Sequence, residues 1–392
     1  MNFSKSRNTP HPFIKIVLVT LSLFTLINLF NSCSSTKSKL TNGEKDSKTV
    51  LKLKPSENNP RNSEGDFISL KDGRILFIYS RYSGDSASDH APASLAGRYS
   101  SDGGKTWTNE DEIIVTNEGG MNVMSVSLLR LQNGKIVLFY IKKNSNEDAS
   151  PMMRISNDEA KTWSDPIQCI TNKPGYFVLN NDRVIQLKNG RIILPVSRHN
   201  TPDSEWRNKG DLFCYYSDDN GNTWLSSTQV PDTTNITVQE PGLIEMSDGR
   251  IMMYARASDG FQMNSYSSDY GVTWNSIQNT TIPSPLSPAS IEKIPATGDW
   301  LIVWNNNDGT KKSIGGKRTP LTMAISKDEG KTWENIKNIE NNPEGWYCYT
   351  AIDFVGDQVL LSYCAGVRKK GASGSGLATT NITQIGLDWI YK

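Results

Sequence analysis

Apolar residues along the chain are grouped in short runs that begin directly after a turn signal. In six places a Gly beside Asp or Asn precedes such a run, and these glycines are Gly73, Gly134, Gly190, Gly249, Gly298 and Gly356. Asp-Gly or Asn-Gly between apolar runs is the strongest local signal for a β-hairpin. Hairpins at this spacing, each with room for about four short strands, predict an all-β fold, a six-bladed β-propeller.

A second pattern, Ser-x-Asp-x-Gly-x-Thr-Trp, recurs five times at intervals of 50 to 61 residues. These Asp boxes are Ser100–Trp107, Ser156–Trp163, Ser217–Trp224, Ser267–Trp274 and Ser326–Trp333. Ser and Asp oxygens can accept hydrogen bonds from a tight turn, Gly permits a positive φ, and a buried Trp anchors the turn. The second box has Ala160 in place of Gly, which predicts a looser turn. We expect the boxes to be structural, as in other repeat folds.

The ends of the chain differ from this repeat. A basic segment and an apolar run from Ile16 to Phe30 precede Cys33, a pattern typical of a bacterial lipoprotein signal. We therefore predict a signal peptide over residues 1–32, lipidation of Cys33, a disordered tether over 33–58 and a single propeller domain over 59–392. The last repeat has no Asp box, so we expect residues before Arg61 to supply its outer strand. The protein would then be an exported, periplasmic or cell-surface lipoprotein, anchored in the outer membrane by its lipid.

Charge and cysteine content exclude some classes of function. The formal net charge is +1 and no cluster of Lys and Arg stands out, so a nucleic-acid partner is not expected. The three histidines are too few and too scattered for a zinc site, and neither a metal nor a cofactor is expected. The spacing of Cys169, Cys214, Cys348 and Cys364 leaves open whether they are buried thiols or form a disulfide.

Charged residues at the ends of apolar strands are the candidates for a functional site. Arg81 and Arg256 follow their hairpin glycines by eight and seven residues, and Arg198 is their counterpart in the third repeat. Glu64 and Glu240 both lie nine residues before their glycines, where an inner strand begins. Because strand ends converge around the axis of a propeller, we expect these five side chains to surround one pocket.

The five Asp boxes, the six hairpins and these arginines together resemble the sialidase-like superfamily of exo-glycosidases, over nearly all of the chain after the tether. The resemblance implies a tyrosine nucleophile activated by a glutamate, an aspartate as acid/base, and three arginines that clamp the substrate carboxylate. A neutral phenol suits an anionic substrate because it avoids the repulsion of a carboxylate nucleophile. Arginine suits the clamp because its planar fork donates two parallel hydrogen bonds.

The resemblance assigns catalytic roles by position. Glu240, in a Glu-Pro pair, is similar to the activating glutamate, and Tyr349, in Tyr347-Cys-Tyr-Thr-Ala, to the nucleophile, with Tyr347 as the alternative. Asp89, in the loop before the first Asp box, is similar in place to the acid/base, with Asp85 as its rival.

The same resemblance assigns the substrate-binding residues. Arg256 and Arg318 are similar to the second and third clamp arginines, and Arg81 to the arginine before the acid/base loop. For the first clamp arginine the family has Arg-Ile-Pro, whereas Arg61 lies about two residues further from its hairpin and is followed by Glu64. Glu64 would repel an acidic ligand or bind a sugar hydroxyl.

The predicted function is removal of a terminal acidic sugar, sialic acid or a similar sugar, from a glycan by a Tyr349/Glu240 pair and Asp89. One alternative is a propeller glycosidase or lyase acting on uronic-acid or deoxy-sugar polysaccharides, with His90 or His199 central. Another is a glycan-binding lipoprotein without catalysis. If Tyr349 and Glu240 lie within hydrogen-bond reach while Arg256 and Arg318 face the same cavity, removal of a terminal acidic sugar is the favoured function.

Overall fold

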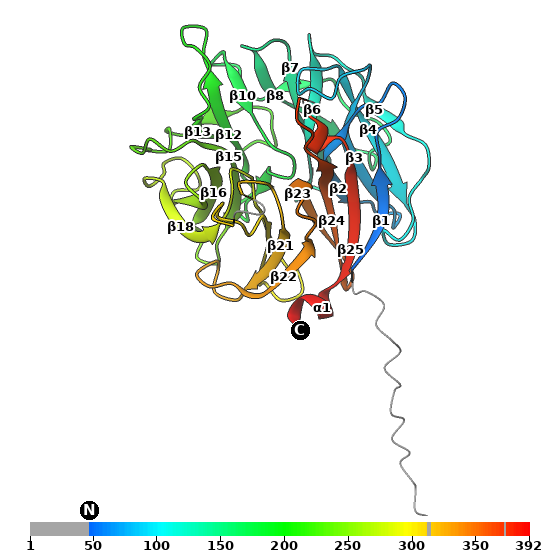
Figure 1. Cartoon of the computed structure of the whole chain (residues 1–392). Coiled ribbons are helices and arrows are strands. Elements are labelled where there is room, and N and C mark those ends of the chain that lie inside the picture. Colours follow the sequence, from blue (N-terminus) through cyan, green and yellow to red (C-terminus); the bar gives the residue numbers. More distant parts are fainter. Residues whose placement is uncertain (1–46, 312–314, 372–373) are drawn as a thin grey trace, which may run out of the picture. The chain divides into compact units, whose positions relative to one another are not determined.

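The computed structural model describes residues 47–311, 315–371 and 374–392, which form an all-β unit, as expected (Figure 1). In this part of the chain the only helical elements are a 3-10 turn, η1 (Ser375–Leu377), and a short helix, α1 (Leu387–Tyr391). None of these described residues forms a helix that could cross a membrane. The predicted signal peptide and Cys33 lie outside the described residues.

Three sheets are four-stranded antiparallel meanders in which consecutive strands are neighbours. The first contains β2 (Asn62–Ser69), β3 (Ile75–Tyr82), β4 (Ala93–Ser100) and β5 (Glu112–Val115). The second contains β15 (Val238–Glu245), β16 (Ile251–Ala257), β17 (Phe261–Ser267) and β18 (Gln278–Pro283). The third contains β19 (Ser290–Lys293), β20 (Trp300–Trp304), β21 (Leu321–Ser326) and β22 (Glu334–Glu340). In each, the hairpin predicted from the sequence joins the first two strands.

A larger, nine-stranded sheet joins two meanders that the sequence predicted as separate. One contains β6 (Asn122–Arg130), β7 (Ile136–Lys143), β8 (Ala149–Ser156) and β9 (Ile167–Gln168). The other contains β10 (Tyr176–Val178), β11 (Ile185–Gln186), β12 (Ile192–Asn200), β13 (Asp211–Ser217) and β14 (Leu225–Ser226). They are joined by one parallel pair, Tyr176 with Ala149. Because the short β10 pairs with both β12 and β8, hydrogen bonding continues from one meander into the next.

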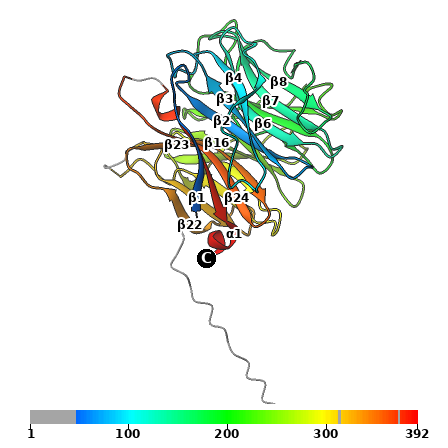
Figure 2. The same ribbon diagram turned by 90° about the vertical axis from the view of Figure 1, so that its right-hand side faces the viewer.

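The last sheet unites the two ends of the described chain (Figures 1 and 2). Its order is β1 (Ser47–Leu53), β25 (Thr380–Gly386), β24 (Gln358–Val367) and β23 (Gly345–Val355). The expectation that residues before Arg61 supply the outer strand is thus confirmed. The tether predicted over 33–58 is wrong for residues 47–53, because their backbone pairs with β25. The last repeat has no Asp box and no further strand after β25, so β1 takes the place of its outer strand.

All six predicted hairpin glycines have a positive φ, between 61° and 94°. At Gly73 the backbone N–H donates to the carbonyl of Leu70 at 3.0 Å, closing the turn between β2 and β3. A side chain at such a φ would be strained, which explains why each turn uses glycine.

The Asp boxes form the predicted turns. In the first box, Gly104 N donates to Ser100 Oγ at 2.9 Å, while the backbone N and Oγ1 of Thr106 donate to Asp102 at 2.9 and 2.7 Å. Ala160 keeps the same hydrogen bond to Ser156, at 2.9 Å, with a φ of 63°, so the looser turn predicted there is wrong. Its backbone adopts the conformation of the glycine it replaces.

Partners for the Trp side chains are less uniform. The indole N–H groups of Trp107 and Trp224 each donate to a box glycine carbonyl at 3.1 Å. Those of Trp163, Trp274 and Trp333 have no hydrogen-bond partner within the described ranges. Burial of the indole ring therefore stabilises the Asp box more than a hydrogen bond from the indole N–H does.

The charge of a box carboxylate is expected to add stability only above its own pKa. Hydrogen bonds from Thr106, first from its hydroxyl and then from its backbone, lower the pKa of Asp102 to about 2. A lowered pKa contributes stability that is present above the ordinary value, about 3.9, and is lost as the pH falls through 2. Asp102→Asn should lower the free energy of unfolding by about 1 kcal/mol at pH 5, a modest effect because the turn is exposed.

Thermal unfolding of wild type and Asp102→Asn at pH 5, 3 and 2 measures this effect, and the two melting points should converge at the lowest pH. Asp203→Asn, at an exposed Asp outside the boxes, is the matched control and should change little at any pH. The same deficit at pH 5 and pH 2 would contradict a role for the carboxylate charge.

Candidate active site

The first strands, in chain order, of four meanders carry a β-bulge at the same place. The pairing of β2, β6, β15 and β23 with the next strand shifts register there. The residues at the bulges have φ values of 56° (Glu64), 63° (Ser125), 53° (Glu240) and 55° (Tyr349). Positive φ is uncommon for residues other than glycine and is concentrated at functional sites, where bulges redirect side chains. All four residues line one cavity.

Ser125 was not a candidate in the sequence, although a signal for it exists. It lies nine residues before Gly134, the spacing that relates Glu64 to Gly73 and Glu240 to Gly249. Because serine carries no charge, a search for charged residues at this spacing finds the two glutamates but not Ser125. Its hydroxyl lies 2.9 Å from Glu64 Oε2, and its backbone N donates to Ser80 Oγ at 3.0 Å.

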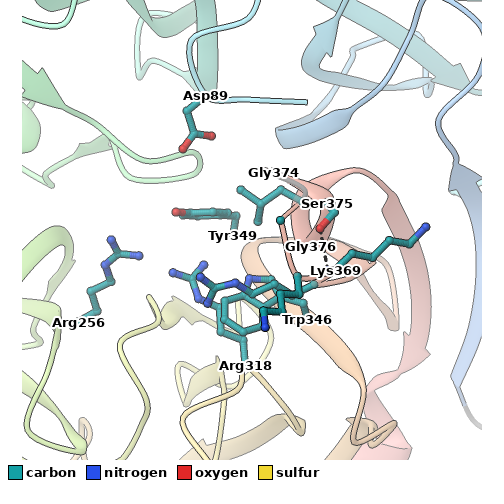
Figure 3. Close-up of a pocket in the computed structure, with 13 residues that line it drawn as sticks. Asp89, Arg256, Arg318, Trp346, Tyr349, Lys369, Gly374, Ser375 and Gly376 are labelled. Atoms are coloured by element: carbon teal, nitrogen blue, oxygen red, sulfur yellow. Dashed lines mark hydrogen bonds between the residues drawn. The ribbon is translucent and has the colours of Figure 1, made fainter. Parts of the chain in front are cut away.

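Two adjoining hollows, which share three lining residues, make up the site, and Figure 3 shows the larger one. The larger, about 850 Å³, is lined by Arg318, Trp346 and the segment after β24, and the smaller, about 190 Å³, by Glu64, Glu240 and aromatic residues. Asp89, Arg256 and Tyr349 line both. In Figure 3 the Tyr349 ring lies between Asp89 on one side and Arg318 with Trp346 on the other.

Tyr349 and Glu240 are within reach of each other. The Tyr349 hydroxyl donates to Glu240 Oε1 at 3.4 Å, and Glu240 Oε2 also accepts from Asn180 Nδ2 at 3.1 Å. Burial first, and then the negative charge of Glu240, raise the pKa of the Tyr349 phenol, although Arg256 and Arg318 oppose this. The phenol is therefore neutral at pH 7, with the Glu240 carboxyl group in place to accept its proton.

Arg256 and Arg318 are about nine-tenths buried, yet parts of their guanidinium groups lack partners. The Nε atoms of both have no hydrogen-bond partner within the described part of the chain. Arg256 Nη1 lies 3.0 Å from Glu240 Oε2, and Arg318 Nη2 donates to the carbonyl of Leu286 at 3.2 Å. Buried N–H groups without partners are costly unless a ligand satisfies them, and a carboxylate suits two arginines best.

Arg61 corrects one prediction. Its side chain is completely buried and lines neither hollow, so it is not placed to contact a substrate. Its Nε donates to Ser63 Oγ and its Nη2 to Glu64 Oε1, both at 2.9 Å, and its Nη1 pairs with Asp89. The two-residue offset noted in the sequence leaves this arginine to pair with the buried Glu64 and with the exposed Asp89.

Arg81 and Arg198 are also corrected, because neither lines the site. Arg81 Nε donates to Asp111 at 2.9 Å, and Arg198 Nη2 to Asp211 at 3.4 Å. Both follow their hairpin glycines by eight residues, whereas Arg256 follows its glycine by seven. A difference of one residue turns a strand side chain to the opposite face of the sheet, so these three were not equivalent.

The alternative residues are placed less well for chemistry. Tyr347 lines neither hollow and packs against Tyr363, with ring centroids 6.3 Å apart. Asp85 and His90 are exposed loop residues outside both hollows. His199 lines the smaller hollow, but Nδ1 contacts the carbonyl of Arg207 at 2.8 Å and Nε2 contacts Ser197 Oγ at 3.1 Å.

The cysteines and possible metal ligands add little to the site. Cys169, Cys214, Cys348 and Cys364 are buried free thiols, which resolves the question that their spacing left open. Across the described ranges, no three His, Cys, Asp or Glu side chains are grouped as metal ligands would be.

The chain is similar to known proteins of the sialidase group. The family model for the BNR repeat-like domain matches residues 98–361. A sialidase from Paraclostridium sordellii is 29% identical over 237 residues, 53% of this chain and 55% of that protein. One from Clostridium perfringens is 30% identical over 232 residues, 52% of this chain and 58% of that protein. The chain thus spans little more than half the length of these curated relatives.

Solved structures share the fold at low identity. A Dyadobacter fermentans protein of unknown function has a TM-score of 0.67 at 20% identity, covering 87% of this chain and 100% of that one. The NanB sialidase of Streptococcus pneumoniae has a TM-score of 0.65 at 14% identity, covering 87% of this chain and 71% of that one. The sequence match and the shared fold agree, and the chain belongs to the BNR repeat-like family within the sialidase-like superfamily.

Proposed function

We propose that the protein is a sialidase-type exo-glycosidase that removes a terminal acidic sugar from glycans. The observation that carries this proposal is the contact between Tyr349 and Glu240 in a cavity that two partly unpaired arginines also face. The names of the curated relatives point the same way. Release of free sugar from a panel of terminal sialosides and uronides tests it, and a purified protein inactive on every member would overturn it.

We also propose that the six meanders are the six blades of a propeller. In the large sheet, β10 would be an additional strand that joins two neighbouring blades. The contacts between strands of neighbouring meanders support a ring. β2 contacts both β6 and β23, β15 contacts β12 and β19, and β19 contacts β23. Such a ring would bring the bulges of β2, β6, β15 and β23 to one axis, which agrees with their common cavity.

The chemistry follows from the contacts of Tyr349. As Glu240 takes the phenol proton, the Tyr349 oxygen attacks the anomeric carbon, and the bond to the leaving oxygen breaks as that oxygen is protonated. Water then displaces Tyr349 from the same carbon, so the configuration is retained. Two carboxyl groups on the cavity wall, Asp89 and Glu64, can exchange protons with the leaving oxygen and the water.

The charges favour an acidic sugar. The guanidinium groups of Arg256 and Arg318, which line the larger hollow with Tyr349, suit a substrate carboxylate, and the neutral nucleophile does not repel it. Sialic acids and uronic acids both carry a carboxylate, and the panel separates them. Both ring nitrogens of His199 are engaged, so the tyrosine reaction is favoured over one centred on that histidine.

Arg318→Lys is expected to reduce kcat/KM for the acidic sugar by about tenfold to a hundredfold. Lys keeps the charge but not the fork, so one or two charge-assisted hydrogen bonds of about 1.5–3 kcal/mol are lost. Steady-state kinetics measure the loss, most of it as a higher KM. Arg198→Lys is the matched control and should change kcat/KM less than twofold, since Arg198 faces away from the cavity. Equal losses in both variants would contradict the clamp.

Export, lipid attachment at Cys33 and outer-membrane anchoring stay proposals, supported by the sequence pattern of residues 1–33. The same holds for the domain limits before residue 47. Metabolic labelling of cells with a radioactive fatty acid tests lipidation, and an unlabelled protein would contradict it.

A further inference from the structure

Two consecutive asparagines contact the two members of the Tyr349/Glu240 pair. They belong to residues 180–183, between β10 and β11, and Asn180 and Asn181 are 4% and 0% exposed. Asn180 donates to the Glu240 carboxylate, and Asn181 donates to the backbone of Tyr349. We propose that both are positioning residues of the reaction, Asn181 for Tyr349 and Asn180 for Glu240. This proposal rests on the glycosidase function proposed above and adds two residues to its site.

The bulges of β2 and β23 leave backbone groups without a partner in their sheets. In β23 the pairing with β24 skips residues 349–350, and in β2 the pairing with β3 skips residues 64–65. A buried carbonyl group without a hydrogen bond is costly, so these groups need other partners. Asn181 Nδ2 donates to the carbonyl of Tyr349 at 3.1 Å and to that of Gly65 at 3.0 Å. One amide group thus binds both bulges.

The hydrogen bond to Tyr349 is important because the backbone is strained there. Tyr349 has a φ of 55°, a conformation that persists only where the surrounding contacts enforce it. Asn181 supplies one such contact. Ser290 supplies another, since its Oγ donates to the carbonyl of Thr350 at 2.6 Å. The direction in which the Tyr349 side chain leaves the strand therefore depends on the amide of Asn181.

The residues after Asn181 are fixed by contacts with other strands. The backbone N of Asp182 donates to the carbonyl of Val126 in β6, and Asp182 Oδ2 accepts from the backbone N of Ile352 in β23, both at 3.0 Å. Arg183 is 2% exposed, and its Nη2 donates to the carbonyl of Ala289, directly before β19, at 2.6 Å. Asn181 is thus held firmly enough to position a neighbouring strand, as a supporting residue must be.

Asn180 contacts the proton acceptor directly. Its Nδ2 donates to Glu240 Oε2 at 3.1 Å, and the same oxygen lies 3.0 Å from Arg256 Nη1. Because these two donors hold Oε2, the other oxygen, Oε1, faces the Tyr349 hydroxyl at 3.4 Å. Without the amide, Arg256 alone would hold Oε2, and the carboxylate could turn away from the phenol. Asn180 thereby keeps Glu240 in the orientation that proton transfer needs.

Asn181→Leu tests the contact with Tyr349 on the best substrate of the panel. Leu has nearly the size of Asn but donates no hydrogen bond, so kcat should fall at least about a hundredfold while KM changes less than about threefold. The change falls on kcat because Arg256 and Arg318 are unaltered. Steady-state kinetics measure both constants.

Asn305→Leu is the matched control. Asn305 is 1% exposed, donates from Nδ2 to the carbonyl of Pro320 at 3.0 Å and lines neither hollow. Its variant should lower the melting point about as much as Asn181→Leu does, but kcat should change less than about threefold. Equal losses of kcat in the two variants, or a loss in Asn181→Leu that is confined to KM, would overturn the proposal.

Asn180→Ala and Asn180→Gln give a second measurement in case Asn181→Leu does not fold. Asn180→Ala removes the donor to Glu240 and should reduce kcat by about tenfold to a hundredfold. Asn180→Gln keeps an amide at the wall of the smaller hollow, so its loss of kcat should be less than about fivefold. Equal losses in the two variants would overturn the role of Asn180. Wild-type protein without activity on any glycoside would instead overturn the proposed function, so the two failures are distinct.

Discussion

Tyr349→Phe is expected to reduce release of the terminal sugar by about a thousandfold or more, because the variant lacks the attacking oxygen. The ring keeps its place at the bulge of β23, and only the contact with Glu240 at 3.4 Å is lost. Kinetics on the best substrate of the panel measure the effect. The loss should be mainly in kcat, since Arg256 and Arg318 are unchanged and would still bind the carboxylate of the substrate.

Tyr347→Phe is the matched control for this experiment. Tyr347 belongs to the same strand, two residues earlier, but packs against Tyr363 outside both hollows. Its variant should keep most of the activity, and both variants should melt within a few degrees of wild type. Undiminished turnover in Tyr349→Phe would refute the nucleophile, whereas a large loss in both variants would point to a disturbed strand.

Trp107→Ala should lower the free energy of unfolding by about 3–5 kcal/mol, the range for truncation of a large buried aromatic side chain. Trp107 is 9% exposed and packs against Phe67 and Phe77, with ring centroids 6.0 and 6.3 Å away. The same cluster contains Leu360 and Ile382 of the last sheet, so the ring lies at the seam between the first sheet and the last. Its loss would also leave the Gly104 carbonyl without the indole N–H.

Denaturant titration at constant temperature measures this difference. Leu225→Ala is the control, since Leu225 follows the third box directly but is 57% exposed, and it should change the free energy of unfolding by less than about 0.5 kcal/mol. An unchanged midpoint for Trp107→Ala would contradict the structural role of the box.

Local patterns in the sequence predicted the turns well because the causes are local. A positive φ at Gly73 or Gly356, and the capture of backbone N–H groups by Ser100 and Asp102, depend on residues within one turn. The equal spacing of Glu64 and Glu240 from their glycines also predicted that both reach the same cavity, as they do. Register counted from a turn is reliable when no residue is inserted.

The arginines show where that counting failed. Arg81 and Arg198 differ from Arg256 by one residue in their distance from the hairpin, and this places them on the other face of the sheet. Arg61 has the charge expected of a clamp, but Glu64 and Asp89 surround it. Residue type alone does not tell which charges will be paired inside the protein.

By itself, the sequence determined the all-β class, the repeat and the turns, because each depends on a short motif. Its resemblance to the sialidase-like superfamily added Tyr349, Glu240, Arg256 and Arg318 as a candidate set. Only the tertiary structure decided that residues 47–53 are the segment that completes the last sheet, that Tyr349 reaches the cavity lined by Glu64, Ser125 and Glu240, and that Arg61 is enclosed. These features depend on contacts between segments that are far apart in the chain. The free energies of such contacts come from burial and charge pairing in the folded state, so a local sequence motif does not predict them.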